Sequence, residues 1–205
     1  MQLNNLIALD ADGVLVDYNQ GYARAWEQAF GVQLKEINPH AYWAVDRYEV
    51  PRLDCAGRAQ LRAAMDSTYW GTLSALPGAL AACVSLKAQG YRLVCVSAIE
   101  AKHQPARLRN LAALGFPLDD VIATGGGSVG GISPKAAVIR QLAPIAFVDD
   151  FAPYLTGLAG GPTHLALILR ELEGSPNQGA ALTLANSTHR NLEAFAAWWP
   201  TTPKF

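Results

Sequence analysis

The stretch LIALDADGVLV, residues 6–16, places two aspartates between two apolar runs. The run 6–9 has no polar interruption, which is typical of a strand buried on both faces of a sheet. Asp10 and Asp12 follow it one residue apart, and Gly13 then favours a turn. One carboxylate at this position is explained by capping of the turn. Two carboxylates at the end of a buried strand call for a chemical reason.

Beyond residue 75, predicted strands alternate with predicted helices. The clearest unit is LPGALAACVSLKAQGYRLVCVS, in which Pro77 begins a helix, Gly90 ends it and a strand covers 92–96. Further strands are expected at 121–123, 145–150, 164–170 and 180–185, and further helices at 105–114, 133–142 and around Trp198 and Trp199. This alternation predicts the α/β class, with a parallel sheet that helices cover on both faces.

Residues from about 16 to 75 interrupt this alternation. Apolar residues at helical spacing run over 18–30 and end at Gly31, residues 32–57 are irregular, and a helix is expected over 58–70. Because the segment contains no convincing strand, we interpret it as a small α-helical cap inserted after the first strand. The predicted organisation is a core domain of residues 1–15 plus 76–205 and a cap domain of residues 16–75.

The composition argues against several classes of protein. The chain has 205 residues, 51% of them hydrophobic and 16% charged, and this length suffices for one full core with a small second module. A formal net charge of −1 predicts neither a nucleic-acid footprint nor a membrane-surface patch. No run approaches the roughly 20 apolar residues of a membrane span, and no secretory signal is visible. We therefore expect no nucleic-acid partner and no membrane partner.

The three cysteines, Cys55, Cys83 and Cys95, form no CxxC pair. An odd number of cysteines argues against a disulfide framework. We expect all three to be small buried apolar residues in a reducing compartment. The expected location is therefore the cytoplasm.

In an open parallel sheet, ligands bind beyond the carboxyl ends of the strands. The residues expected there are Asp10, Asp12, Ser97, Asp149 and Asp150, with Lys135 at the start of a helix. Carboxylates gathered at one edge repel one another, and a divalent hard cation relieves that repulsion because it prefers oxygen ligands. The sequence therefore predicts Mg²⁺, which is held by one or two carboxylates and keeps positions for water and phosphate oxygens.

A phosphate ester suits the remaining groups of this set. The Ser97 hydroxyl and the Lys135 ammonium can bind phosphate oxygens. Asp10 can attack phosphorus to form an aspartyl-phosphate, and Asp12 can protonate the leaving alcohol and later activate water. Tyr18 and Asn19 follow this segment most closely in the cap, and we expect them to determine specificity.

Four short motifs resemble, in this order, those of the haloacid dehalogenase-like (HAD) hydrolase superfamily. LDADGVL resembles its first motif, VCVSA its second, SPK its third and FVDD its fourth, and together they cover about residues 5–155. The resemblance implies a three-layer Rossmann-like core with a cap inserted after the first motif. It also implies that Asp10 is the nucleophile, that Asp12 is the acid/base, and that Ser97 and Lys135 bind the transferring phosphoryl group.

The resemblance further implies a set of metal ligands. Mg²⁺ would be held by Asp10, by the backbone carbonyl of Asp12 and by Asp149, and Asp150 would support the metal or its waters. The fourth motif of the family often carries a further acidic or amide residue several positions on. The segment DDFAPYL supplies none.

The second aspartate bears on which reaction of the superfamily applies. The dehalogenase and phosphonate-cleaving branches resemble this motif but lack the second aspartate, so Asp12 favours hydrolysis of a phosphate ester. The expected protein is a Mg²⁺-dependent cytoplasmic phosphatase of a small phosphorylated metabolite, acting as a monomer or homodimer. A HAD-type phosphomutase and a non-catalytic relative that binds a phosphorylated ligand stay open as alternatives.

The segment GGGSVG suggests a different function, the binding of a dinucleotide. Gly125, Gly127 and Gly130 fit GxGxxG after a strand, and Asp149 and Asp150 end the next strand about 20 residues later, as in a dinucleotide-binding site. However, the expected helix begins too late after the last glycine, and this interpretation leaves the first aspartate pair unexplained. It is a remote alternative.

Overall fold

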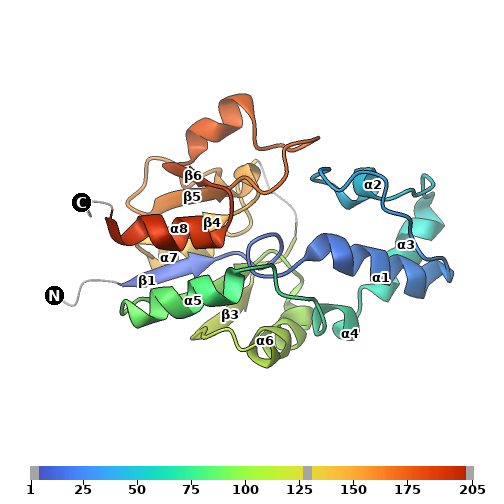
Figure 1. Cartoon of the computed structure of the whole chain (residues 1–205), viewed down its shortest axis with the longest axis horizontal. Coiled ribbons are helices and arrows are strands. Elements are labelled where there is room, and N and C mark those ends of the chain that lie inside the picture. The colour runs from blue at the N-terminus through green and yellow to red at the C-terminus, as the bar shows by residue number, and fades with distance from the viewer. Residues whose placement is uncertain (1–4, 127–130, 202–205) are drawn as a thin grey trace.

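A six-stranded parallel sheet organises the computed structural model, which describes residues 5–126 and 131–201. The strands lie in the order β3-β2-β1-β4-β5-β6. Their bounds are β1 Leu6–Leu9, β2 Arg92–Ser97, β3 Asp120–Ala123, β4 Ala146–Asp149, β5 His164–Ile168 and β6 Ser187–His189. The first strand is therefore central, with a neighbour on each side (Figure 1).

The register of the central strands decides which residues meet at the carboxyl edge. Leu9 lies opposite Cys95 of β2 and opposite Val148 of β4. The backbone N–H of Asp10 donates to the carbonyl of Val148 over 2.8 Å. The residues that follow the ends of β1, β2 and β4 are consequently neighbours, as the motif order predicts.

Helices cover both faces of this sheet. They are α5 (Ala79–Ala88), α6 (Gln104–Ala113), α7 (Ala136–Leu142) and α8 (Leu192–Trp198). Ile7 and Leu9 belong to a buried cluster that includes residues of α5, α6 and α8. Ala8 points to the opposite face and packs in a second cluster with α7. The predicted α/β class and its three layers are confirmed.

The segment between β1 and α5 is helical and lies beyond the carboxyl ends of the strands (Figure 1). It comprises α1 (Tyr18–Phe30), α2 (Ala44–Arg47), α3 (Cys55–Ala64) and α4 (Ser67–Trp70). Its two ends run side by side, because Val16 and Ala75 form a β-bridge and the N–H of Leu76 donates to the carbonyl of Leu15. We call this segment the helical insertion; its division from the core at residues 16 and 75 stays a prediction.

Helix α1 begins at the capping residue Asp17 and ends at Gly31, the end that the sequence pattern predicts. The Asp17 carboxylate accepts from the N–H of Gln20 over 2.9 Å, and Gly31 closes the helix with a φ of 68°. The cap at Asp17 fixes the first turn of α1 directly after the turn that carries Asp12. Tyr18 and Asn19 are therefore held close to the carboxyl end of β1.

Three predictions about local structure are wrong. The helix expected over 58–70 is two helices, because the Asp66 carboxylate accepts from two N–H groups that begin α4. The strand expected over 180–185 is a 3₁₀ helix, Gly179–Leu184, and the last strand begins only at Ser187. Cys55 is exposed at the start of α3, whereas the other two cysteines are buried as expected.

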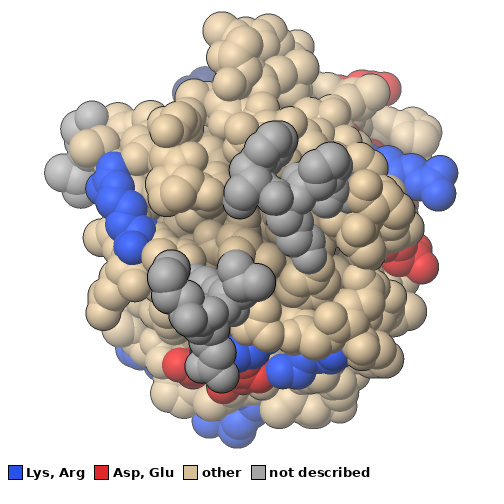
Figure 2. Space-filling model, turned by 90° about the vertical axis from the view of Figure 1, so that its left-hand side faces the viewer, with Lys and Arg blue, Asp and Glu red and all other residues tan. Residues whose placement is uncertain are grey.

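The face opposite the helical insertion carries few charges. In Figure 2 most of the visible described residues are uncharged, and acidic and basic side chains are mixed where they occur. This face has no extended basic region among the described residues. Across residues 5–126 and 131–201, no helix has the length and apolar character needed to cross a membrane.

Candidate active site

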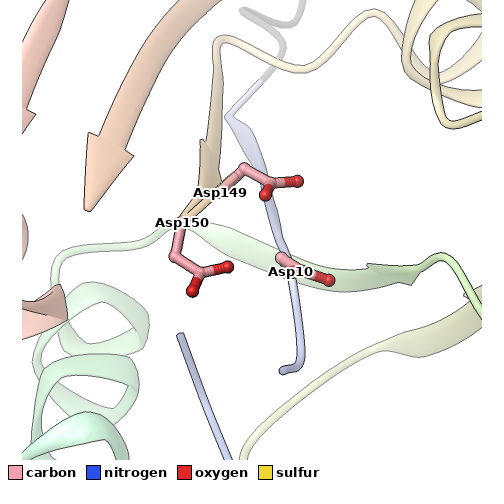
Figure 3. A group of neighbouring side chains, drawn as sticks. All are labelled: Asp10, Asp149 and Asp150. Atoms are coloured by element: carbon pink, nitrogen blue, oxygen red, sulfur yellow. The ribbon is translucent and has the colours of Figure 1, made fainter. Parts of the chain in front are cut away.

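Polar side chains gather where β1, β2 and β4 end. Asp10 follows β1, Ser97 ends β2, Asp149 ends β4, and Asp150 comes next. The carboxylates of Asp10, Asp149 and Asp150 offer oxygens that all lie within 4.8 Å of one another (Figure 3). All three side chains are buried. The convergence predicted from the strand ends therefore exists in the fold.

Lys135 lies between two of these carboxylates. Its Nζ is 2.7 Å from Asp10 Oδ1 and 2.7 Å from Asp149 Oδ2, and its side chain is fully buried. The ammonium also lies 4.6 Å from the ring centroid of Tyr154. Burial alone lowers the pKa of Lys135, but the two carboxylates outweigh it and raise that pKa above its usual value. Lys135 therefore stays charged and uses two of its three N–H donors.

Burial has the opposite effect on the carboxylates. Loss of water raises the pKa of Asp149 to about 6, against the lowering effect of Lys135. Burial likewise raises the pKa of Asp10 well above its usual value, again opposed by Lys135 and reinforced by Asp149. One lysine does not fully offset the negative charge at this edge. A further cation would stabilise the ionised carboxylates.

Asp149 and Asp150 differ in what their oxygens contact. Asp149 Oδ2 pairs with Lys135, and Asp149 Oδ1 accepts from the N–H of Phe151 over 2.9 Å. Asp150 lines the cavity at this edge together with Asp10, and only its Oδ2 has an ion-pair partner, Arg170, among the described residues. Of the two neighbouring carboxylates, Asp150 is thus the one with an oxygen available towards the cavity.

These donors fit a magnesium ion. Ligands around one octahedral Mg²⁺ at 2.0–2.1 Å lie about 3 to 4 Å apart, and the oxygens of the three aspartates need only a small shift to reach such spacing. The backbone carbonyl of Asp12, the remaining implied ligand, accepts no hydrogen bond from the described residues. Carboxylate and carbonyl oxygens are also the ligand types that Mg²⁺ prefers.

Asp12 is paired with an arginine that the sequence analysis missed. Arg107 of α6 donates through Nη2 to both carboxylate oxygens of Asp12, over 2.7 and 2.9 Å. Arg107 is fully buried, lies 5.0 Å from the ring centroid of Trp70, and its Nε and Nη1 have no hydrogen-bond partner among the described residues. Asp12 itself lines the cavity. The guanidinium holds the Asp12 carboxylate in one orientation at the cavity wall.

The cavity has a volume of about 320 Å³ and lies between the strand ends and the helical insertion. Tyr18 and Asn19 both line it, as do other aromatic residues of the insertion. Two buried polar atoms of this region, Ser97 Oγ and Asn19 Nδ2, have no hydrogen-bond partner in the part of the chain that the structure describes. Buried polar groups are normally paired, so these two atoms are suited to a ligand that brings acceptor oxygens.

A second arginine missed by the sequence analysis also lines the cavity. Arg170 follows β5, and its Nε donates to Asp150 Oδ2 over 2.7 Å. Its guanidinium lies 4.8 Å from the ring centroid of Tyr42, whose hydroxyl donates to the backbone carbonyl of Asp150. The rule used for β1, β2 and β4 could have found Arg170, since it ends the strand expected over 164–170. Arg107 carries no such signal.

The structure thus brings the predicted catalytic, phosphate-binding, metal-binding and specificity residues to one edge of the sheet. Their individual roles stay predictions. Of the glycine-rich segment, Gly125 follows β3 with a φ of 79°, whereas Gly127 and Gly130 lie outside the described residues. The dinucleotide interpretation therefore stays untested.

Comparison with known proteins identifies the class. A family model described as haloacid dehalogenase-like hydrolase matches residues 5–159. The chain belongs to the haloacid dehalogenase-like hydrolase family, as the four motifs predict. No curated protein sequence matches it significantly.

Solved structures share its fold at low sequence identity. A HAD family hydrolase from Deinococcus radiodurans R1, with bound phosphate and sodium, is 18% identical with a TM-score of 0.61, over 96% of this chain and 95% of that one. A predicted phosphoglycolate phosphatase from Haemophilus somnus 129PT is 19% identical, with a TM-score of 0.62 over 95% and 97%. An L-2-haloacid dehalogenase from Xanthobacter autotrophicus is 14% identical, with a TM-score of 0.61 over 97% and 99%. At these identities the likeness concerns the fold alone.

Proposed function

We propose that the protein is a Mg²⁺-dependent phosphatase that hydrolyses a small phosphorylated metabolite. The observation that carries this proposal is the second carboxylate. Asp10 and Asp12 line the same cavity, and Arg107 holds the Asp12 side chain there. A nucleophile alone suffices to displace a halide, whereas an alcohol leaving group also needs a proton donor.

The residues of this chain divide the reaction as follows. An Asp10 oxygen attacks phosphorus, and the leaving alkoxide takes a proton from Asp12, which gives an aspartyl-phosphate and a free alcohol. Asp12 then removes a proton from water as that water attacks the aspartyl-phosphate, releasing inorganic phosphate and restoring Asp10. Ser97 Oγ and the third N–H of Lys135 bind oxygens of the phosphoryl group throughout.

Magnesium would be held by Asp10, Asp150 and the backbone carbonyl of Asp12. When bound, Mg²⁺ would supply positive charge that offsets the carboxylates and the phosphate. The two oxygens of Asp149 already contact Lys135 and the N–H of Phe151. Asp149 would therefore position Lys135 and would not bind the metal directly. The family resemblance implies the reverse, with Asp149 as the metal ligand and Asp150 as the supporting residue.

The proposal is tested by activity with a generic ester. With p-nitrophenyl phosphate we expect turnover that needs Mg²⁺, is abolished by EDTA and is lost in Asp10→Asn. The matched control is Asp120→Asn, which makes the same change at an exposed residue at the start of β3 and should leave activity intact. Halide release from 2-chloropropionate measures the competing reaction. Halide release without phosphatase activity, or full activity in Asp10→Asn, would refute the proposal.

A phosphomutase differs in the fate of the phosphoryl group. A mutase returns the phosphoryl group of the aspartyl-phosphate to a sugar phosphate, whereas a phosphatase transfers it to water. Release of inorganic phosphate at the same rate as the alcohol supports the phosphatase. Binding of a phosphorylated compound without any turnover would instead favour the non-catalytic relative.

We also propose the cytoplasm as the location and a monomer or homodimer as the assembly. Three free thiols support a reducing compartment. Size-exclusion chromatography with light scattering distinguishes the two assemblies.

A further inference from the structure

Arg170 has no part in the mechanism above, yet it lines the cavity. Its side chain is 19% exposed and lies against Asp150 and the ring of Tyr42. Its Nε is used by Asp150, whereas its two terminal nitrogens make no hydrogen bond to any described residue. A guanidinium that is held on one edge and stacked on a ring presents its remaining donors in a fixed direction.

The surroundings of Arg170 leave it little freedom. Gly13, with a φ of 83°, has no room for a Cβ, because that atom would lie 2.0 Å from Asp150 Oδ2 and 2.8 Å from Arg170 Nε. Asp150 is in turn fixed through its carbonyl, which accepts from the Tyr42 hydroxyl over 3.1 Å and from Asn177 Nδ2 over 2.6 Å. The arginine is therefore positioned before any ligand arrives.

Arg170 and Ser97 lie on opposite sides of β1 in the sheet. Ser97 ends β2, on one side of β1, whereas Arg170 follows β5, which lies on the other side beyond β4. Neighbouring strands are about 4.8 Å apart, so β2 and β5 are separated by about 14 Å. Arg170 therefore enters the cavity from the β5 side, where its Nε lies 2.7 Å from Asp150 Oδ2, whereas Ser97 lies on the β2 side.

The charge of the cavity wall agrees with this placement. Among the described residues that line the cavity, Arg170 is the one cationic side chain; Lys135 and Arg107 are fully buried and contact the lining carboxylates of Asp10 and Asp12. Asn19 Nδ2 adds an unpartnered donor to the same cavity. At about 320 Å³ the cavity is at the small end of the range for ligand sites, about 300–1,000 Å³, so both ends of a compact ligand reach its walls.

We propose that Arg170 is a specificity-determining residue that binds a second anionic group of the substrate, a carboxylate. The preferred substrates are then small phosphorylated acids rather than neutral or cationic phosphate esters. This inference rests on the proposed phosphatase function and adds a substrate class to it. Arginine suits the task because its fork of donors matches the two oxygens of a carboxylate.

Two pairs of substrates isolate the carboxylate. 2-Phosphoglycolate and ethyl phosphate have the same length, and O-phosphoserine and O-phosphoethanolamine differ in the same group. We expect the acid of each pair to have the higher kcat/KM. Arg170→Met should lower kcat/KM for the two acids by about 10- to 100-fold, which is the effect of losing a charged hydrogen bond. It should lower kcat/KM for ethyl phosphate and O-phosphoethanolamine much less. Arg170→Lys keeps the charge without the forked pair of donors. Its kcat/KM for the acids should lie between those of the unmodified protein and Arg170→Met.

Controls separate this role from other roles of the same side chain. Arg109→Met makes the same change at an exposed position of α6 and should leave kcat/KM unchanged for both members of each substrate pair. Calorimetric titration of Mg²⁺ into Arg170→Met shows whether the metal site is intact. Binding of the four compounds to Asp10→Asn, measured by calorimetry, should show the same preference for the acids without any turnover.

The outcomes are distinct for the two proposals. If Arg170→Met lowers kcat/KM equally for the acids and for the compounds without a carboxylate, Arg170 only orients Asp150 or the phosphoryl group. That result overturns the inference. Absence of a preference in the unmodified protein overturns it as well. Both results leave the phosphatase function standing if p-nitrophenyl phosphate is hydrolysed. Conversely, a binding preference in Asp10→Asn supports the inference even if no ester is turned over.

Discussion

Replacing Lys135 by methionine tests whether the lysine compensates two buried carboxylates. The variant keeps an unbranched side chain only one heavy atom shorter but removes the ammonium that lies 2.7 Å from both Asp10 and Asp149. The lysine and Asp149 side chains are fully buried, and that of Asp10 is only 6% exposed, so water cannot replace the lost partner. In metal-free protein at pH 8, we expect a large loss of stability.

The size of the loss follows from this burial. Removing one partner of a buried ion pair costs about 3–5 kcal/mol of unfolding free energy. Each kcal/mol lowers the midpoint of thermal unfolding by about 2–4 °C in a chain of this size, so the expected drop is about 6–20 °C. The measurement is thermal and urea-induced unfolding followed by circular dichroism in EDTA.

A surface lysine provides the matched control. Lys87 pairs with Asp119, but the side chains of both are about one-third exposed. Lys87→Met should therefore cost less than about 1 kcal/mol. If Lys135→Met costs no more than this control, the lysine does not compensate the aspartates and the reasoning fails.

Two further measurements identify the cause. In the double variant Lys135→Met/Asp149→Asn, one uncompensated charge is gone, so part of the lost stability should return. Mg²⁺ should also stabilise Lys135→Met more than the unmodified protein, since a divalent cation can replace the missing charge. A double variant less stable than Lys135→Met would show that lost packing, rather than charge, destabilises the protein.

Three other predictions follow from the site. Because burial raises the pKa of Asp149 to about 6, the folded state binds its proton more tightly than the unfolded state, and metal-free stability should fall as pH rises from about 4 to 6. Unfolding midpoints in EDTA should vary less across this window in Asp149→Asn. Gly13→Ala should lower both stability and activity, because its Cβ would lie 2.0 Å from a carboxylate oxygen. At Gly31 an added Cβ would meet no atom of the described residues within 4 Å, so Gly31→Ala should cost only the strain of a left-handed backbone, about 1–2 kcal/mol. Arg107→Met should release the Asp12 carboxylate and slow hydrolysis of ethyl phosphate more than that of p-nitrophenyl phosphate, whose leaving group needs little protonation; equal slowing would contradict this.

The chemistry of the strand ends was predictable because it follows from local sequence and one rule of sheet topology. Asp10 and Asp149 follow apolar runs that can only be buried strands, and parallel strands end at one edge. The placement of Lys135 also follows, since SPK begins the helix that leads into β4. The same rule applied to the end of β5 would have indicated Arg170.

The remaining features depend on contacts that local sequence does not encode. Arg107 is one of two arginines on α6, and only the packing of that helix decides that it turns inward while Arg109 is exposed. Tyr42 belongs to an irregular segment whose position is set by contacts with residues near 173 and 174. The segment 180–185 has no strong strand period, and its 3₁₀ turns let Leu182 and Leu184 pack on the core.

The central place of β1 has a consequence for synthesis of the chain. This strand is made first among the six, yet Lys135, the partner of Asp10, and the neighbouring strand β4 follow only about 125 to 140 residues later. At 5–20 residues per second, that interval lasts roughly 7–30 s. During this time the nascent chain carries a hydrophobic strand that lacks at least one of its two neighbouring strands, and an aspartate that lacks its lysine. Affinity for magnesium should therefore emerge late in translation. Metal binding would then indicate that β1 and β4 have paired.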